Sequence, residues 1–121
     1  MYKHEIRRYF QHGTLTQLNS FEAVARHGSF TSAAEELCLS QPTVSVHIKK
    51  LTQTIGLTLF KQAGRRIEVT AAGRELLTGC VDILHALTQV EEKIAPMRKI
   101  KLDKLHGVKS GNVSTEEKRI P

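Results

Sequence analysis

The chain has 121 residues, which suits one small domain with an extension. Its 18 Lys and Arg outnumber its 12 Asp and Glu, so the formal net charge is +6, which is typical of a protein with a polyanionic partner. The polar, basic N-terminus is not that of a signal peptide, and no stretch approaches the roughly 20 apolar residues of a membrane span.

Residues 1–14 form a polar, basic extension ahead of the first predicted helix. The composition favours a disordered tail over the alternative, a tether whose Lys3, Arg7 and Arg8 touch a nucleic-acid backbone. Helical spacing of apolar residues then predicts a first helix over 15–27. The core face of this helix is predicted to consist of Leu18, Phe21, Val24 and Ala25.

The stretch from Gly28 to Ile55 predicts two helices with a tight break between them. Gly28 is a natural end for the preceding helix. In the first helix of the pair, Ser32 followed by Glu35 forms a capping-box pattern, with Thr31 as the alternative N-cap. The break that follows is predicted at residues 38–39.

The second helix of the pair has clear boundary signals. Ser40 is an N-cap candidate, Pro42 lies in the first turn, where its missing N–H costs nothing, and Gly56 supplies a stop. On a wheel of about 100° per residue, one stripe is apolar, and the outer positions carry small polar groups and lysines. Small polar groups reach base edges and cations meet phosphates, so this pattern is typical of a helix that reads DNA. The stripe consists of Val44, Ile48, Leu51 and Ile55, and the outer positions are Gln41, Pro42, Thr43, Ser45, Val46, His47, Lys49 and Lys50.

Residues 57–69 change from helical to alternating periodicity. The alternation, with a turn predicted at 62–64, indicates a short two-stranded hairpin, or wing. Arg65 and Arg66 are predicted to stand at its tip, where they can enter a minor groove or clamp a phosphate; the alternative is a solvated hairpin tip. Every charge from Lys49 to Arg66 is positive, which favours contact with DNA.

Thr70 is predicted to cap a long helix over 71–98, which Pro96 is expected to end or kink near Ala95. Apolar residues recur there at heptad spacing in two parallel seams, too long and broad for a three-helix core to cover. The same helix of a second chain would cover them; the alternative is packing on the chain's own domain alone. The predicted dimerisation residues are Leu76, Leu77, Cys80, Ile83, Leu84, Leu87, Val90 and Ile94.

Together these segments resemble the winged helix-turn-helix of LysR-type transcriptional regulators. The resemblance extends from Leu15 to Ile94. It implies a mainly α fold, with a DNA-binding domain of three helices and a two-stranded wing over 15–70, followed by a linker and dimerisation helix over 71–98. A narrower resemblance, to regulators of carbon-fixation operons, is carried by residues 42–45 and 49–52. The motifs behind the family resemblance are Gly28–Thr31, Ala33–Glu35, Leu39–Ser45, Gly56, Leu59–Phe60, Gly64–Arg66, Thr70 and Ala72–Gly73.

The C-terminal residues 99–121 are predicted to form a hinge and a disordered tail. Residues 105–111 resemble the hinge that precedes the effector domain of the family. Residues 112–121 are polar and cannot begin a hydrophobic core, so we expect the effector domain to be absent.

The resemblance implies a homodimer that binds double-stranded DNA at an inverted repeat, with the two recognition helices in successive major grooves. Several contacts can be assigned by chemistry. Ser40 and the helix amides would hold a phosphate, and Pro42 and Val46 suit thymine methyls. Base-edge hydrogen bonds are assigned to Gln41, Thr43 and Ser45, base or phosphate contacts to His47 and Lys49, and phosphate or minor-groove contacts to Lys50, Arg65 and Arg66.

Other classes of protein are less favoured. Cys38, Cys80 and the six dispersed histidines show no metal or redox spacing, so we expect small buried thiols in a reducing cytoplasm, and no metal or cofactor. An enzyme is the least favoured class, because neither a phosphate loop nor a nucleophile elbow is present. The alternatives to a regulator with its own operator are a winged-helix protein-interaction module, which should show aromatic anchors on the outer face, and a short regulator that acts without an effector or pairs with a full-length relative.

Overall fold

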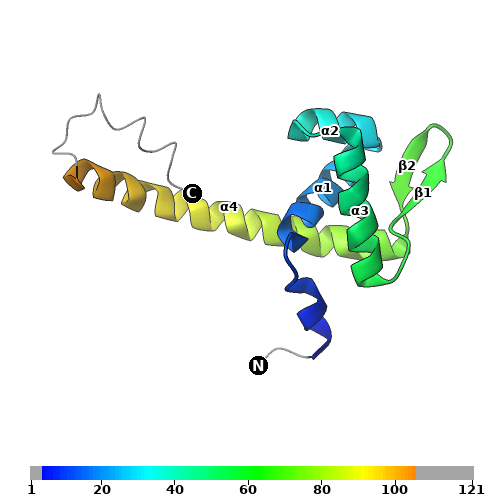
Figure 1. The fold of residues 1–121 in the computed structure, drawn as a ribbon, viewed down its shortest axis with the longest axis horizontal. Helices are drawn as coiled ribbons and strands as arrows, with labels where there is room; N and C mark the ends of the chain where they lie inside the picture. Colours follow the sequence, from blue (N-terminus) through cyan, green and yellow to red (C-terminus); the bar gives the residue numbers. More distant parts are fainter. Residues whose placement is uncertain (1–3, 106–121) are drawn as a thin grey trace. The chain divides into compact units, whose positions relative to one another are not determined.

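The computed structural model describes residues 4–105 and is mainly α-helical, as the sequence predicts (Figure 1). Residues up to Leu84 form one compact unit, and a second unit begins at His85. No helix within the described residues is both long and apolar enough to cross a membrane. In chain order the elements are η1 (His4–Tyr9), α1 (Thr14–His27), α2 (Phe30–Leu37), α3 (Gln41–Ile55), β1 (Phe60–Ala63), β2 (Arg66–Val69) and α4 (Ala71–Leu105).

The N-terminal extension is structured where it is described. Residues 4–9 form the short 3-10 helix η1, whereas the sequence favoured a disordered tail. Residues 11 and 12 then line a polar cleft with Gln17 of α1 and Lys50 of α3. The position of residues 11 and 12 beside α1 and α3 depends on tertiary contacts, and the local composition of the sequence does not predict such contacts.

Helix ends follow the capping signals of the sequence with one exception. Gly28 and Gly56 end α1 and α3 in the left-handed conformation, at φ of 68° and 83°. The capping box predicted at Ser32 is wrong, because Ser29 is the N-cap of α2 and its Oγ accepts a hydrogen bond from the Ser32 N–H at 3.1 Å. Since Ser29 is already extended directly after Gly28, the helix begins at the first available cap.

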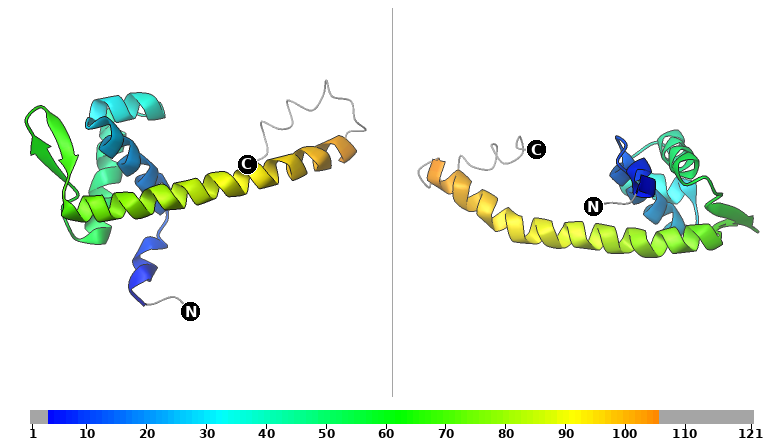
Figure 2. Two further views of the ribbon diagram at one scale, coloured as in Figure 1. Left: turned by 180° about the vertical axis from the view of Figure 1, so that it is seen from behind. Right: turned by 90° about the horizontal axis from the view of Figure 1, so that it is seen from below.

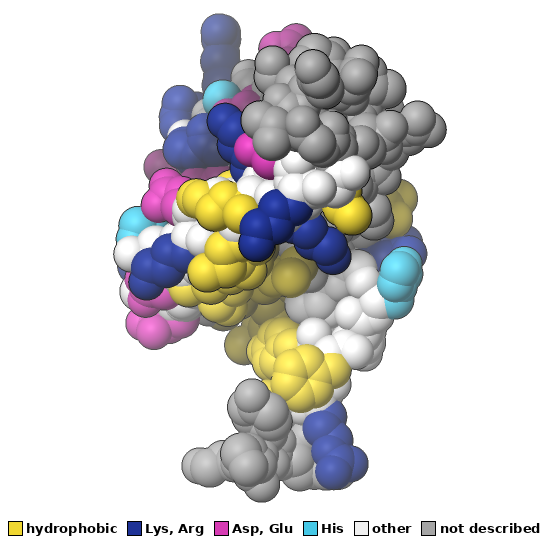
Figure 3. Space-filling view, turned by 90° about the vertical axis from the view of Figure 1, so that its left-hand side faces the viewer, with side chains coloured by type: hydrophobic (Ala, Val, Ile, Leu, Met, Phe, Trp, Pro, Cys, Tyr) yellow, Lys and Arg dark blue, Asp and Glu magenta, His cyan; other side chains and the backbone are white. Residues whose placement is uncertain are grey.

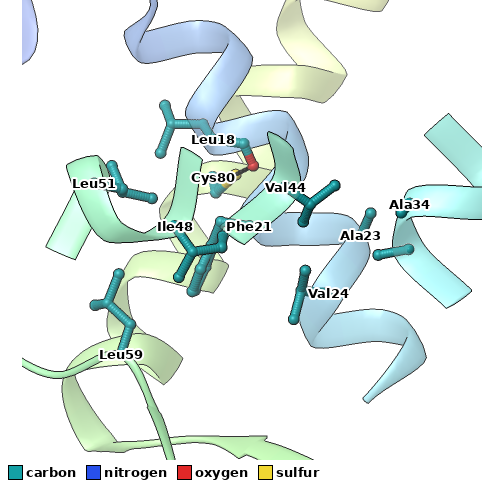
Figure 4. Close-up of a cluster of buried hydrophobic side chains, with 11 residues drawn as sticks. Leu18, Phe21, Ala23, Val24, Ala34, Val44, Ile48, Leu51, Leu59 and Cys80 are labelled. Carbon is teal, nitrogen blue, oxygen red and sulfur yellow. Dashed lines mark hydrogen bonds between the residues drawn. The ribbon is translucent and has the colours of Figure 1, made fainter. Parts of the chain in front are cut away.

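Helices α1, α2 and α3 contact one another around one hydrophobic core (Figure 4). The predicted stripe of α3 is confirmed: Val44, Ile48 and Leu51 are buried, and Ile55 is half-buried against the same core. On α1, Ala25 is only half-buried, and Ala23 is the buried alanine. The other buried hydrophobic members of the core are Leu18, Phe21, Val24, Ala33, Ala34, Leu59 and Cys80.

The wing is an antiparallel pair of strands in which Phe60 faces Val69 and Ala63 faces Arg66. Its turn is formed by Gly64 and Arg65, later in the chain than the predicted turn at 62–64, and Gly64 has a φ of 64° that favours glycine. The Phe60 ring packs on the Phe21 ring, with 5.2 Å between centroids. This aromatic contact joins the base of the wing to the helical core.

The first turns of α4 belong to the core of the domain. Thr70 caps the helix, because its Oγ1 accepts a hydrogen bond from the Gly73 N–H at 3.1 Å and donates one to the Thr58 carbonyl at 2.6 Å. Cys80 is 1% exposed, and its thiol donates to the Leu18 carbonyl at 3.2 Å. Burial, with a smaller effect of the Glu22 charge, raises the pKa of this thiol to about 11.

Helix α4 continues through Pro96 to Leu105, so the prediction that it ends near residue 98 is wrong (Figure 2). Proline removes one helical hydrogen bond, but a helix can continue with a kink where other contacts support it. Here Arg98 forms two hydrogen bonds with the Glu91 carboxylate, at 2.9 and 3.2 Å, and this ion pair spans the proline. Residues 99–105 of the predicted hinge are therefore helical, and the remaining hinge and tail, 106–121, lie outside the described residues.

Candidate nucleic-acid interface

The N-terminal end of α3 presents small polar side chains in a fixed local arrangement. The Ser40 Oγ accepts a hydrogen bond from the Thr43 N–H at 3.2 Å and lies 2.8 Å from the Thr43 hydroxyl. The Gln41 amide donates to the Ser45 hydroxyl at 3.0 Å. Ser40, Gln41 and Thr43 are exposed and Ser45 is half-buried, and the first turn carries no acidic residue. The positive end of the helix dipole is thus open to an anion.

The rest of the outer face of α3 is apolar or cationic. Pro42, Lys49 and Lys50 are exposed, and Val46 is 47% exposed. Their exposure follows directly from the burial of the opposite stripe, as the helical wheel predicts. This surface therefore offers hydrogen-bonding groups at one end, an apolar strip along it, and two cations, which is the set of groups needed to contact base edges and phosphates together.

His47 differs from its neighbours because it also contacts α1. Its Nδ1 lies 2.7 Å from the hydroxyl of Ser20, which is 1% exposed, and its ring is half-buried. Ser20 could not be recognised in the sequence, since no local pattern connects it with a residue 27 positions later. Nδ1 of His47, a candidate DNA-contacting residue, is therefore hydrogen-bonded to a buried side chain of α1.

The two arginines of the wing occupy different places. Arg65 lies in the exposed turn. Arg66 opens β2, and its guanidinium lies so close to Gly28 that a β-carbon added there would be 2.6 Å from Nη2. The C-terminal end of a helix favours a cation, so α1 stabilises this orientation. Both arginines are exposed at the turn end of the wing, and the Arg66 guanidinium lies toward the C-terminal end of α1.

An ion-pair network joins α1 to α2 on the surface of the helix-turn-helix. Arg26 binds both Glu22 and Glu36, and His27 also contacts Glu36. Hydrogen bonds from Arg26, and then from His27, lower the pKa of Glu36 to about 2, and the same carboxylates raise the pKa of Arg26. These two carboxylates are thus matched by the Arg26 cation of their own domain.

The predicted dimerisation residues divide between the core and the surface. The assignment of Cys80 to an interface is wrong, because the side chain is buried in its own domain, and Leu76, Leu77 and Leu84 also pack partly against that core. Ile83 is 47% exposed in the first unit. In the second unit, the exposed members of the set are Leu87, Val90 and Ile94.

Exposed hydrophobic side chains are also visible in the space-filling view. On the face drawn in Figure 3, yellow hydrophobic groups reach the surface.

The two cysteines are free; Cys38 is exposed at the turn after α2, with a φ of 58°, so the expectation that it is buried is wrong. Among residues 4–105, no group of His, Cys, Asp and Glu could hold a metal ion.

Comparison with known proteins identifies the family. Residues 15–74 match the bacterial regulatory helix-turn-helix proteins of the lysR family. The chain is 46% identical over 103 residues to the HTH-type transcriptional activator CmpR of Synechocystis, covering 85% of this chain and 31% of that one. It is 41% identical over 111 residues to a RuBisCO operon transcriptional regulator of Acidithiobacillus ferrooxidans, covering 92% and 35%. The chain thus spans about a third of the length of these curated relatives.

Solved structures give the same result for the fold. The structure of a BenM_DBD/catB site 1 DNA complex superposes with a TM-score of 0.62 at 31% identity, covering 67% of this chain and 93% of that chain. The structure of a CbnR_DBD–DNA complex superposes with a TM-score of 0.62 at 31% identity, covering 69% and 97%. With its capped recognition helix, its two-stranded wing and these relatives, the chain belongs to the LysR family of bacterial regulatory helix-turn-helix proteins.

Proposed function

We propose that this chain is the DNA-binding part of a transcriptional regulator, which binds double-stranded DNA at an inverted repeat as a homodimer and acts in the cytoplasm without catalysing a reaction. One observation carries the proposal: the exposed, Ser40-capped end of α3 stands on a packed three-helix core in a chain of the LysR family. The similar BenM and CbnR structures are complexes with DNA, and the similar curated proteins are transcriptional regulators.

The exposed groups divide into those that can read bases and those that can bind phosphates. Gln41 can pair bidentately with adenine once it releases Ser45, and Thr43 and Ser45 supply hydroxyls to base edges. The N-terminal end of α3 and Lys50 are suited to phosphates, and Lys49 can reach either kind of group. At the wing, the exposed Arg65 and Arg66 are suited to a phosphate or the minor groove, and Arg66 would have to turn away from Gly28 to reach either.

The division between readers and phosphate binders predicts different losses for two variants. Gln41→Ala is expected to cost about 1–3 kcal/mol on the preferred duplex and little on a scrambled one. Lys50→Ala is expected to weaken both duplexes alike and to reduce the salt slope by about one unit, whereas Lys50→Arg keeps the charge and should keep the slope. The measurement is fluorescence anisotropy on a duplex selected by the wild-type chain from a random pool, at two or more salt concentrations.

This experiment also separates the proposal from its main alternative. Wild-type protein that selects no duplex, or that binds every duplex equally and loses all binding in salt, would favour the protein-interaction module. Equal losses for Gln41→Ala on selected and scrambled duplexes would show that Gln41 does not read a base.

The proposed dimer relies on exposed apolar residues in the second unit. Leu87, Val90, Ile94 and Met97 follow heptad spacing on α4, and each is between 41% and 66% exposed. Such a stripe on a helix is most simply covered by the same helix of a second chain. Covering it would join two recognition helices in one complex, as an inverted repeat requires.

A charge in this stripe is expected to dissociate the dimer. Leu87→Asp should give a monomer by sedimentation equilibrium and should lower the affinity for the inverted repeat by about a hundredfold or more, because the two half-sites are then bound separately. His85→Asp introduces the same carboxylate about half a helical turn away, at an exposed position, and should leave the mass unchanged. A wild-type chain that is monomeric at micromolar concentration would contradict the proposed dimer.

A further inference from the structure

The hydroxyl of Ser20 is a buried polar group with a single hydrogen-bonding partner in the described part of the chain. Ser20 is 1% exposed on α1, and its Oγ lies 2.7 Å from Nδ1 of His47 on α3. A serine hydroxyl carries one hydrogen, and a buried hydrogen of this kind needs an acceptor. The imidazole nitrogen is the acceptor within reach.

This contact has a consequence for the imidazole ring. When the Ser20 hydroxyl donates to Nδ1, the neutral ring must carry its hydrogen on Nε2. The other tautomer would point Nδ1–H at the Ser20 Oγ and leave the buried hydroxyl hydrogen without an acceptor. The geometry therefore selects the Nε2–H tautomer of His47.

The selected nitrogen lies on the part of the ring that is not engaged by α1. His47 is half-buried, and the described residues provide no hydrogen-bonding partner for Nε2. In the helix, His47 shares one row with Thr43 and Lys50, both of which are exposed beside the outer face of α3. The Nε2–H group thus has no partner within the described residues, on a side chain that belongs to the row beside the outer face of α3.

We propose that Ser20 is a positioning residue for DNA recognition, which holds His47 as a hydrogen-bond donor of fixed tautomer and direction. The acceptor on the duplex is an oxygen or nitrogen lone pair, supplied either by a phosphate or by the acceptor edge of a purine or thymine in the major groove. This inference rests on the proposed DNA binding, but its tautomer can be measured in the protein without DNA.

The first test is made on the free chain. Long-range proton–nitrogen correlation spectra of the nitrogen-15-labelled protein, at about pH 8, report which ring nitrogen of a neutral histidine carries the hydrogen. The His47 signals are assigned by their absence from a His47→Gln variant. We expect the Nε2–H pattern in the wild type and a mixture of tautomers in Ser20→Ala. A wild-type ring with its hydrogen on Nδ1, or no change in Ser20→Ala, would overturn the proposal.

The second test separates the two nitrogens of the ring by substitution. Glutamine places its amide nitrogen about where Nε2 lies, and asparagine places its amide nitrogen about where Nδ1 lies. His47→Gln should therefore keep more of the affinity for the selected duplex than His47→Asn, which keeps a polar group toward Ser20 but should lose about three- to tenfold. Ser20→Ala should lose about threefold with an unchanged salt slope, since no charge is removed. Thermal unfolding of each variant confirms that it is folded.

The binding measurements also identify the group on the duplex that accepts the hydrogen bond from His47. A loss for His47→Asn on the selected duplex alone indicates a base, and an equal loss on the scrambled duplex indicates a phosphate. If His47→Asn binds like the wild type, the Ser20 contact serves packing only and the proposal is wrong. If the wild type binds no duplex, the proposed DNA binding fails, while the tautomer measured in the free chain is unaffected.

Discussion

Replacing Phe21 with alanine is expected to lower the free energy of unfolding by about 3–5 kcal/mol. Phe21 is the largest of the fully buried side chains and is 0% exposed on α1. Its ring also packs against Phe60, which belongs to the wing. The substitution therefore removes buried apolar surface, leaves a cavity among three helices, and removes the contact that joins the wing to the core.

Urea denaturation followed by circular dichroism measures this loss. The control is Leu57→Ala, which removes a leucine that is 59% exposed in the loop after α3 and should change stability by less than about 0.5 kcal/mol. Since small domains are stable by only about 5–15 kcal/mol, Phe21→Ala should remove a large share of the free energy of unfolding. Equal effects of the two substitutions would contradict the packing described for Phe21.

Gly73→Ala is expected to destabilise the domain by about 1–3 kcal/mol, although alanine is the better helix former. A β-carbon at this position would overlap the Leu59 carbonyl oxygen and would lie 3.1 Å from Cβ of Val69. The Leu59 carbonyl cannot move away freely, because it accepts a hydrogen bond from the Thr70 N–H at 2.9 Å and Leu59 itself is buried. The close approach of α4 to Leu59, the residue before β1, thus requires glycine at position 73.

The same helix contains a matched control. Gly79 has no heavy atom within 4 Å of its would-be β-carbon, so Gly79→Ala should stabilise the domain by about 0.5–1 kcal/mol through helix propensity alone. Thermal and urea unfolding of the two single variants should therefore show shifts of opposite sign. Shifts of the same sign would show that the contact between Gly73 and Leu59 does not constrain the helix.

Much of the fold could be predicted because its signals are local. Gly28, Ser40 and Gly56 act on backbone groups within one helical turn, so their roles at helix ends are visible in the sequence. The stripe from Val44 to Ile55 repeats with the period of a helix, and the outer face of α3 follows from it as the opposite side. The family could be recognised for the same reason, since its motif lies within this contiguous stretch.

The errors have a common cause, which is competition between local patterns. Ser29 and Ser32 are both acceptable N-caps, and no local feature of the sequence decides between them. Pro96 is a strong local signal for the end of a helix, yet the pair of Arg98 with Glu91 forms across it. The heptad seam of α4 is apolar along most of its length, but Cys80 is buried in the helical core, whereas Leu87 and Ile94 of the same seam are exposed.

The sequence by itself determined the order of the elements from α1 to α4, the recognition helix with its outer face, and the family, because periodicity, caps and motifs act over a few residues. Only the tertiary structure decided that Ser20 holds His47, that Arg66 turns back to Gly28, and that Gly73 lies against the Leu59 carbonyl. Each of these contacts joins residues more than ten positions apart, and its energy depends on a distance that exists only after the helices and the wing have packed.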